Sequence, residues 1–196
     1  MSTEPNPDAP HVLVLYAHPA PQRAPLMRAL AAAARELPGV RLRDLYELYP
    51  DFDVDGAHER NLLAHAGVMV LLHPIRWYGM PSLLKEWMEV VLQPGWAYSH
   101  EGTGALNGKG FWLVTTSGSG PDAYRPGGLH GRPFADFMPP FEQTAALCGM
   151  DWIEPLVIHG AMQLDAAAID ALAGEFQRRL MGYTGTLPTG GPPDGT

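Results

Sequence analysis

Short apolar segments alternate with helix-favouring segments along most of the chain, and this alternation limits the fold more than any other feature. Most of the apolar segments are continuous, which is typical of strands buried on both faces rather than on one. We therefore expect a parallel sheet with helices on either side. The expected strands are residues 11–16, 40–44, 68–73, 110–115 and 152–158, and the expected helices are residues 26–37, 57–66, 83–92, 140–148 and 165–183.

Five strands in one chain of this length predict a single three-layer α/β domain over residues 11–183, with strand order 2-1-3-4-5. Pro155 predicts that the last strand lies at an edge, because proline cannot donate to a second neighbour. The Pro-, Gly- and Thr-rich residues 1–10 and 184–196 are expected to be disordered tails. In such sheets ligands bind at the carboxyl ends of the strands, which directs attention to the loops after strands one, three and four.

Charge and composition exclude several classes of protein. The net charge of −8 argues against a general nucleic-acid surface, which needs a positive footprint. The start of the chain does not resemble a signal peptide, no apolar run approaches ~20 residues, and Cys148 is the only cysteine, so we expect a cytoplasmic protein. His58, His65 and His73 lack metal-ligand spacing and are interpreted as surface or capping groups, and His159 as a cap after strand five. We expect no metal site.

The first loop, residues 16–25, leads into the Ala-rich helix. A helix start offers free amides and the positive end of a dipole, which suits an anion such as a phosphate. His18 and Arg23 could add donors. The alternative is a proline-stiffened connection in which His18 only caps backbone groups. No GxGxxG is present, so a Rossmann dinucleotide site is disfavoured.

The second loop, residues 73–81, contains adjacent Trp77 and Tyr78 beside Arg76 and Gly79. The two rings could pack on a planar ligand, although either ring alone could equally plug the core. Arg76 could stabilise negative charge on the edge of a reduced heteroaromatic ring.

The third loop, residues 115–120, is made of small residues that allow a ligand to approach the backbone closely, or that simply make a flexible loop. Tyr124 and His130 follow in a Gly-rich segment and could donate to a substrate or accept a proton.

Six segments together resemble the flavodoxin-fold NAD(P)H:quinone oxidoreductases. The likeness covers residues 11–183 and is greatest to the ancillary oxidoreductases of glutathione-regulated potassium-efflux systems, with DT-diaphorase as a more distant relative. The block HP-x-x-WY-x-x-P-x-x-LK-x-W is the most specific. The segments are YAHP (16–19), DLYELYPDFDVD (44–55), HPIRWYGMPSLLKEWMEVV (73–91), GWAY (95–98), ALNGK (105–109) and TTSGSG (115–120).

The resemblance implies a flavodoxin-like fold that binds FMN, or alternatively FAD, and uses NAD(P)H as co-substrate. It places His18 at the flavin phosphate and matches Tyr124 and His130 to a Tyr/His pair that assists hydride transfer. The implied cofactor-binding residues are Ala24, Pro25, Leu26 and Met27 in the phosphate loop, Ile75, Arg76, Trp77 and Tyr78 along the isoalloxazine, and Thr115, Thr116, Ser117 and Gly118 around it.

The chain departs from the family pattern in both loops. Ala24 and Met27 stand where the efflux-linked relatives carry Ser and Asn, which leaves backbone amides and Arg23 to hold the phosphate. Arg76 stands where relatives often have Gln, and Ser117-Gly118-Ser119 replaces a run of glycines. These changes are expected to affect cofactor potential or substrate preference.

The function implied is two-electron reduction of a quinone or similar electrophile, with ping-pong kinetics, by a homodimer. The helix over 83–92 and its Trp87 are either interface elements or core. A second hypothesis is a regulatory subunit on the cytoplasmic face of a potassium/proton antiporter, which would make the protein peripheral to the inner membrane. A third is a carrier of single electrons to a protein partner.

Overall fold

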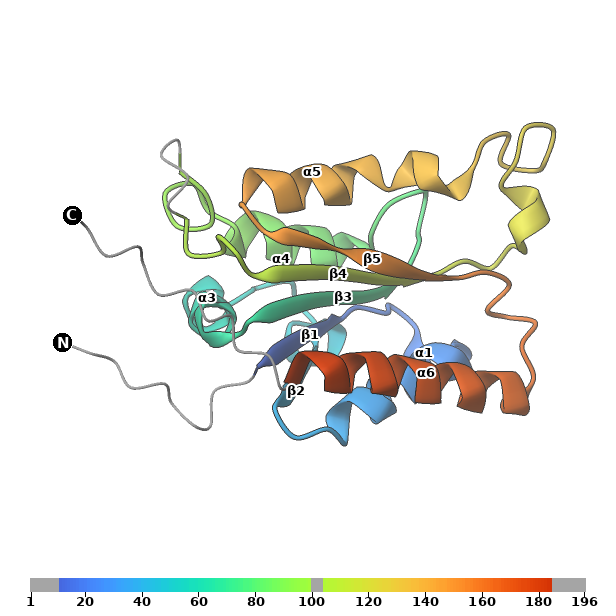
Figure 1. Ribbon diagram of the computed structural model, residues 1–196, viewed down its shortest axis with the longest axis horizontal. Helices are drawn as coiled ribbons and strands as arrows, with labels where there is room; N and C mark the ends of the chain where they lie inside the picture. Colours follow the sequence, from blue (N-terminus) through green and yellow to red (C-terminus); the bar gives the residue numbers. More distant parts are fainter. Residues whose placement is uncertain (1–10, 100–103, 185–196) are drawn as a thin grey trace.

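The computed structural model describes residues 11–99 and 104–184 and contains one sheet flanked by two layers of helices (Figure 1). All neighbouring strands are parallel, in the order β2-β1-β3-β4-β5, as expected from the sequence. The predicted tail at 1–10 and, except for Thr184, the tail at 184–196 lie outside the described residues. The strands are β1 (Val12–Tyr16), β2 (Val40–Asp44), β3 (Val68–Pro74), β4 (Gly110–Thr116) and β5 (Asp151–Ile158).

Helices α1 and α6 pack together on one face of the sheet, and α3, α4 and α5 cover the other (Figure 1). Proline begins α1, where the missing amide is not needed, and the carboxylate of Asp165 accepts from Ala168 N at 2.8 Å to cap α6. The helices are α1 (Pro25–Arg35), α2 (Leu45–Leu48), α3 (Gly56–His65), α4 (Ser82–Val91), α5 (Pro139–Leu147) and α6 (Ala166–Thr184).

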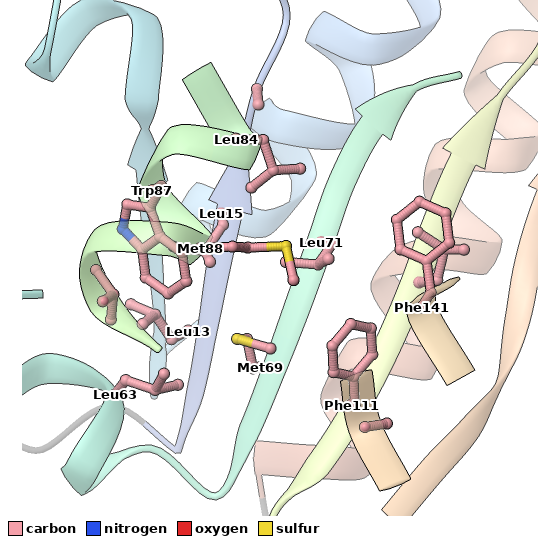
Figure 2. Packing of buried hydrophobic residues seen from close by; sticks show 14 of the residues in the cluster. Leu13, Leu15, Leu63, Met69, Leu71, Leu84, Trp87, Met88, Phe111 and Phe141 are labelled. Carbon is pink, nitrogen blue, oxygen red and sulfur yellow. The ribbon is translucent and has the colours of Figure 1, made fainter. Parts of the chain in front are cut away.

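The core on the α4 face is dense and apolar (Figure 2). Side chains of β1, β3 and β4 meet those of α3, α4 and α5 there, and Trp87 of α4 has no exposed surface. Of the two readings of Trp87, the core reading therefore holds and the interface reading is wrong. Cys148 is also buried, as a small apolar residue would be.

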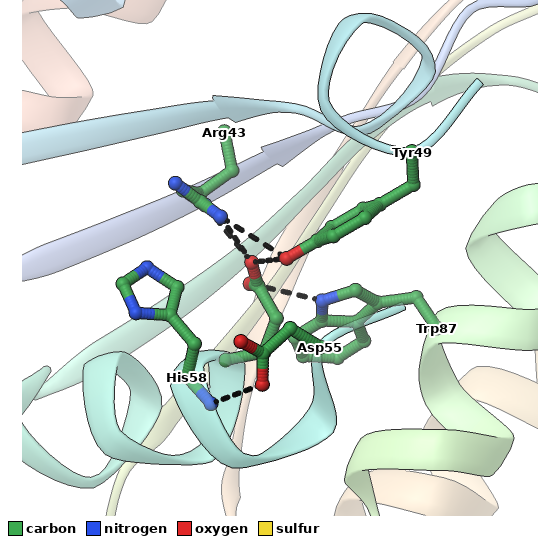
Figure 3. A network of polar contacts seen from close by, with 6 residues as sticks. Arg43, Tyr49, Asp55, His58 and Trp87 are labelled. Atoms are coloured by element: carbon green, nitrogen blue, oxygen red, sulfur yellow. Dashed lines mark hydrogen bonds and ion pairs between the residues drawn. The ribbon is translucent and has the colours of Figure 1, made fainter. Parts of the chain in front are cut away.

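A buried carboxylate joins four segments on this face of the sheet (Figure 3). Glu59 of α3 has no exposed surface and is paired with Arg43 of β2. The Tyr49 hydroxyl donates to the same carboxylate at 2.6 Å, and Trp87 Nε1 of α4 donates at 3.0 Å. A buried charge with this many donors is fully satisfied, and we refer to these four residues as the Glu59 network.

Strand β5 lies at an edge, which confirms the inference from Pro155. The pairing with β4 shifts between Trp112–Ile153 and Val114–Leu156, so Glu154 and Pro155 form a bulge where the missing amide disturbs little. Trp112 Nε1 donates to the Glu154 carbonyl at 3.1 Å and stabilises the irregularity.

The interpretation of His73 as a surface group is wrong, whereas its ring does bond a backbone carbonyl as a capping group would. Its side chain is fully buried at the end of β3 and stacks on Phe141 with ring centroids 5.6 Å apart. Burial lowers the pKa of His73 to about 4, so the ring is neutral at physiological pH. Its Nδ1 bonds the Pro74 carbonyl at 3.0 Å, while Nε2 has no partner among the described residues.

Candidate functional site

A cavity of about 370 Å³ opens at the carboxyl ends of the strands, between the loops that follow β1, β3, β4 and β5. Its size lies within the range usual for small-molecule sites. The first three of these loops are those that the strand order singled out. The lining residues that the sequence predicted are His18, Arg23, Ala24, Pro25, Leu26, Met27, Ile75, Arg76, Thr116, Ser117 and Gly118.

The start of α1 supplies amides to this cavity. Ala24 occupies the N-cap position with no side-chain hydrogen bond to the helix, and the first helical backbone bond runs from Arg28 N to Ala24 O at 3.1 Å. The amides of Leu26 and Met27 therefore keep their hydrogens free. These amides and the helix dipole are of the kind that binds anions in other helices, although Ala24 and Met27 add no side-chain donor.

His18 caps a backbone group of its own loop and also lines the cavity. Its Nδ1 accepts from Ala20 N at 3.0 Å, so the neutral ring carries its hydrogen on Nε2. Burial and then the nearby charge of Arg76 lower the pKa of His18, which favours this neutral form. The ring thus caps its own loop with one nitrogen and keeps a donor on the other.

Trp77 and Tyr78 form the tip of a tight turn closed by two hydrogen bonds between Arg76 and Gly79, of 2.8 and 3.0 Å. Their φ angles are 50° and 66°, a left-handed conformation that is costly for bulky residues and that recurs at functional sites. Trp77 is 96% exposed, so it does not plug the core. Tyr78 is half exposed and stacks on Phe137 with centroids 4.8 Å apart.

The turn after β4 is bound to the loop after β5 and is not a free flexible segment. Ser117 N donates to Ile158 O, Gly160 N to Ser119 O and Ala161 N to Ser117 O, all at 2.9–3.0 Å. This ladder continues the sheet beyond the ends of its strands. Gly118 is exposed at the turn and lines the cavity.

Tyr124 and His130 lie face to face beside this turn. Their ring centroids are 4.2 Å apart with planes inclined by 22°. His130 Nε2 is 3.1 Å from the Ser119 hydroxyl, and Nδ1 is 3.4 Å from the hydroxyl of Tyr78. The pair predicted from the sequence is thus assembled next to the cavity, with the turn of residues 76–79 on its other side.

A profile of the flavodoxin-like fold family matches residues 10–180. The chain belongs to this family.

One curated relative of this flavodoxin-like protein is the glutathione-regulated potassium-efflux system ancillary protein KefF of Citrobacter koseri. The two are 39% identical over 172 residues, which cover 88% of this chain and 96% of the relative. The identity spans nearly the whole of both chains, so the likeness concerns the complete domain and not a single motif.

Two solved structures share the flavodoxin-like architecture. General stress protein 14 from Treponema denticola, in complex with FMN, is 30% identical with a TM-score of 0.80, and the match covers 89% of this chain and 99% of that one. An NADPH-quinone reductase from P. pentosaceus is 27% identical with a TM-score of 0.76, covering 86% and 96%.

Three of the predicted cofactor-binding residues do not line the cavity of the flavodoxin-like domain, and neither do Tyr124 and His130, which lie next to it. Trp77 and Tyr78 stand beside it on their turn, and Thr115 lies on the opposite face of the sheet. Side chains alternate along a strand, so Thr115 and Thr116 cannot both face the cavity. The Thr115 hydroxyl is buried without a partner among the described residues.

Sequence reasoning missed four lining residues, which are Ala20, Pro74, Ala161 and Met162. Ala161 and Met162 follow β5, whose loop was not among the three chosen from the strand order. Met162 is 82% exposed. Such an exposed apolar side chain at a cavity rim indicates a binding site, but its exposure can be recognised only when the fold is known.

Metal sites and membrane-spanning helices were sought in residues 11–99 and 104–184. In that part of the chain no three His, Cys, Asp or Glu side chains are grouped as a metal site would need. No helix within it is both long and apolar enough to span a bilayer.

Proposed function

We propose that the protein is an FMN-dependent NAD(P)H:quinone oxidoreductase. The observation that carries the proposal is the cavity at the carboxyl ends of the strands, where an unblocked helix start meets two arginines and a neutral histidine. The FMN complex of the Treponema denticola protein and the quinone reductase of P. pentosaceus support it.

The start of α1 fits the phosphate of FMN. The free amides of Leu26 and Met27 point along the helix axis, and His18 can donate from Nε2. Arg23 lines the same end of the cavity and supplies the charge that Ala24 and Met27 do not. Backbone donors thus replace the side-chain donors absent from this loop.

The loops after β3 and β4 fit the edges of the isoalloxazine. Ile75 is held by a 2.8 Å bond from its amide to the Thr116 carbonyl, which joins the two loops at the edge of the cavity. Arg76 lies where a positive charge would stabilise a reduced, anionic ring. Bound FMN supplies the hydride exchange between nicotinamide and acceptor.

NAD(P)H and the quinone would occupy the same place in turn, which gives ping-pong kinetics. Tyr124 and His130 would balance the charge that develops on the quinone oxygen and supply its proton. Their hydrogen-bonding neighbours, Ser119 and Tyr78, would hold them in reach of the acceptor.

The surface around the site favours a homodimer. Trp77, Leu129 and Met162 are 96%, 81% and 82% exposed, and each lies in or next to a site loop. Large exposed apolar side chains at such a place are typical of a surface covered by another chain. We propose a cytoplasmic protein because of its likeness to the KefF proteins.

A second candidate function is the role named for these relatives, an ancillary subunit of a glutathione-regulated potassium-efflux system. The 39% identity to KefF over nearly the whole chain favours it. The role is compatible with enzymatic activity, and co-purification with a cation antiporter would support it.

Purification tests the proposed function directly. We expect a yellow protein whose absorbance is bleached by NAD(P)H and restored by a quinone, and mass spectrometry of the released cofactor should give FMN. Release of FAD would correct the cofactor assignment. A protein that takes up neither flavin from a solution in excess would refute the oxidoreductase proposal.

A further inference from the structure

The turn Ser117-Gly118-Ser119 holds two histidines through its two hydroxyls. Ser117 Oγ lies 2.9 Å from His159 Nδ1, and Ser119 Oγ lies 3.1 Å from His130 Nε2. Ser117 is buried, and the backbone of the turn is bonded to the loop that carries His159. The two rings are thus positioned by one rigid segment.

The direction of the hydrogen bonds determines the tautomer of His159. Ser117 Oγ also lies 2.9 Å from the carbonyl of Ser119, which can only accept. A hydroxyl has a single hydrogen, so Ser117 donates to Ser119 and must accept from His159 Nδ1. The neutral His159 ring therefore carries its hydrogen on Nδ1 and keeps the lone pair on Nε2. Burial lowers the pKa of His159, which favours this neutral form.

His159 and His130 both pack against Tyr124. His130 stacks on the ring at 4.2 Å, and His159 contacts it at 5.1 Å with planes inclined by 38°. Phe134 packs edge-on against both Tyr124 and His159, at 4.9 and 5.0 Å. The phenol is consequently fixed by rings from three segments, two of them imidazoles anchored to the same turn.

We propose that His159 is a positioning residue for Tyr124, held in its Nδ1–H tautomer by Ser117. Within the oxidoreductase function proposed above, on which its catalytic consequence rests, His159 keeps Tyr124 stacked on His130 and in reach of the acceptor oxygen. His159 contacts Tyr124 and Phe134 through its ring and the turn through one nitrogen, so both parts of the side chain are needed.

Nuclear magnetic resonance of the full-length chain tests the tautomer without any flavin. Long-range ¹H–¹⁵N correlation of the imidazole nitrogens should show His159 as Nδ1–H in the unaltered protein. Ser117→Ala should shift the nitrogens towards the Nε2–H form, because the acceptor is lost. Ser82→Ala, at an exposed serine of α4, is the matched control and should leave them in place.

Two replacements of His159 separate the ring from the hydrogen bond. His159→Phe keeps a ring beside Tyr124 but no donor, and His159→Asn keeps a donor near the Nδ1 position but no ring. Stopped-flow measurement of the quinone half-reaction should show each about tenfold slower, below the 10²–10⁴ typical of a direct proton donor. Reduction by NAD(P)H should change much less, because Tyr124 acts on the acceptor.

The outcomes distinguish this inference from the proposed function. An Nε2–H tautomer in the unaltered protein would overturn the inference even if the protein reduces quinones. So would ¹⁵N chemical shifts of the His159 ring that stay the same in Ser117→Ala. A wild-type rate of quinone reduction in both His159 variants would also overturn it. Failure to bind flavin would defeat the oxidoreductase function and leave the tautomer test standing.

Discussion

Two polar clusters in this molecule differ in how completely their members are satisfied. In the Glu59 network the carboxylate is buried, and Arg43, Tyr49 and Trp87 all donate hydrogen bonds to it. The cluster around residues 117–119 is only partly buried, and Nε2 of His159 has no hydrogen bond to another described residue. Both tie together segments far apart in the sequence, but only the second keeps capacity for a ligand.

The comparison shows that fully paired, buried polar groups stabilise the fold, whereas partly paired groups at the cavity are available to a ligand. A fully paired buried network matters for stability because removing one member is costly. The remaining partner is then a charge without a counter-charge in an apolar environment. An open cluster at a cavity rim contributes little to stability because water replaces lost bonds there. Stability and flavin binding should therefore respond to different substitutions.

Glu59→Ala should cause the largest loss of stability. The change leaves the largely buried Arg43 guanidinium without its carboxylate and removes the acceptor of Trp87, for an expected loss of about 3–5 kcal/mol in the free energy of unfolding. Urea denaturation measures it. Glu89→Ala is the control, because its ion pair with Lys85 is more than half exposed and should cost under about 0.5 kcal/mol. Equal losses in the two variants would contradict the stabilising role of the Glu59 network.

His73 is an intermediate case, since it is buried like Glu59 but uses only one nitrogen. Its pKa is about 4 in the folded protein against about 6.5 when unfolded. The unfolded chain therefore binds the extra proton between these values, so stability is full above pH 6.5 and falls towards pH 4. The slope from this group is at most about 1.4 kcal/mol per pH unit.

The variant His73→Phe isolates that contribution. Phenylalanine keeps a ring against Phe141 and does not titrate. Denaturation curves between pH 4 and 7 should show a smaller loss of stability on acidification in the variant than in the unaltered protein. Parallel pH dependences would mean that His73 does not contribute.

Arg76→Gln should have the smallest effect on stability and a clear effect on flavin. Arg76 is exposed and makes no side-chain hydrogen bond to a described residue, so the free energy of unfolding should change by less than about 0.5 kcal/mol. Loss of its charge from the cavity should weaken FMN binding roughly tenfold in a fluorescence titration. Arg41→Gln, on β2 and away from the cavity, should not alter FMN affinity. A wild-type affinity in Arg76→Gln would remove Arg76 from the flavin site.

The sheet was predictable because most of its strands are continuous apolar runs. The expected bounds of β1, β3, β4 and β5 each differ from the structure by a single residue, and β2 agrees at both ends. The one-turn helix α2 was missed because a segment of four residues is too short to show a helical repeat of apolar residues. His73 was misread because a histidine at a strand end is usually exposed, and only the packing of Phe141 over it explains its burial.

The candidate site was predictable where it follows the strand order and not where it depends on contacts distant in sequence. The loops after β1, β3 and β4 were chosen from topology alone. No local pattern connects Ser117 with His159, or Arg43 and Trp87 with Glu59, because these pairs meet only in the folded sheet. Alternation along β4 would have separated Thr115 from Thr116.

The wall of the cavity that carries Ala161 and Met162 follows directly after β5, which has a hydrogen-bonded neighbour on one side only. Edge strands open locally at lower free energy than central ones. Local opening of β5 would move this wall outwards. The cavity should therefore open and close together with the strand. A molecule bound there would in turn slow amide exchange along β5, including at amides that it never touches.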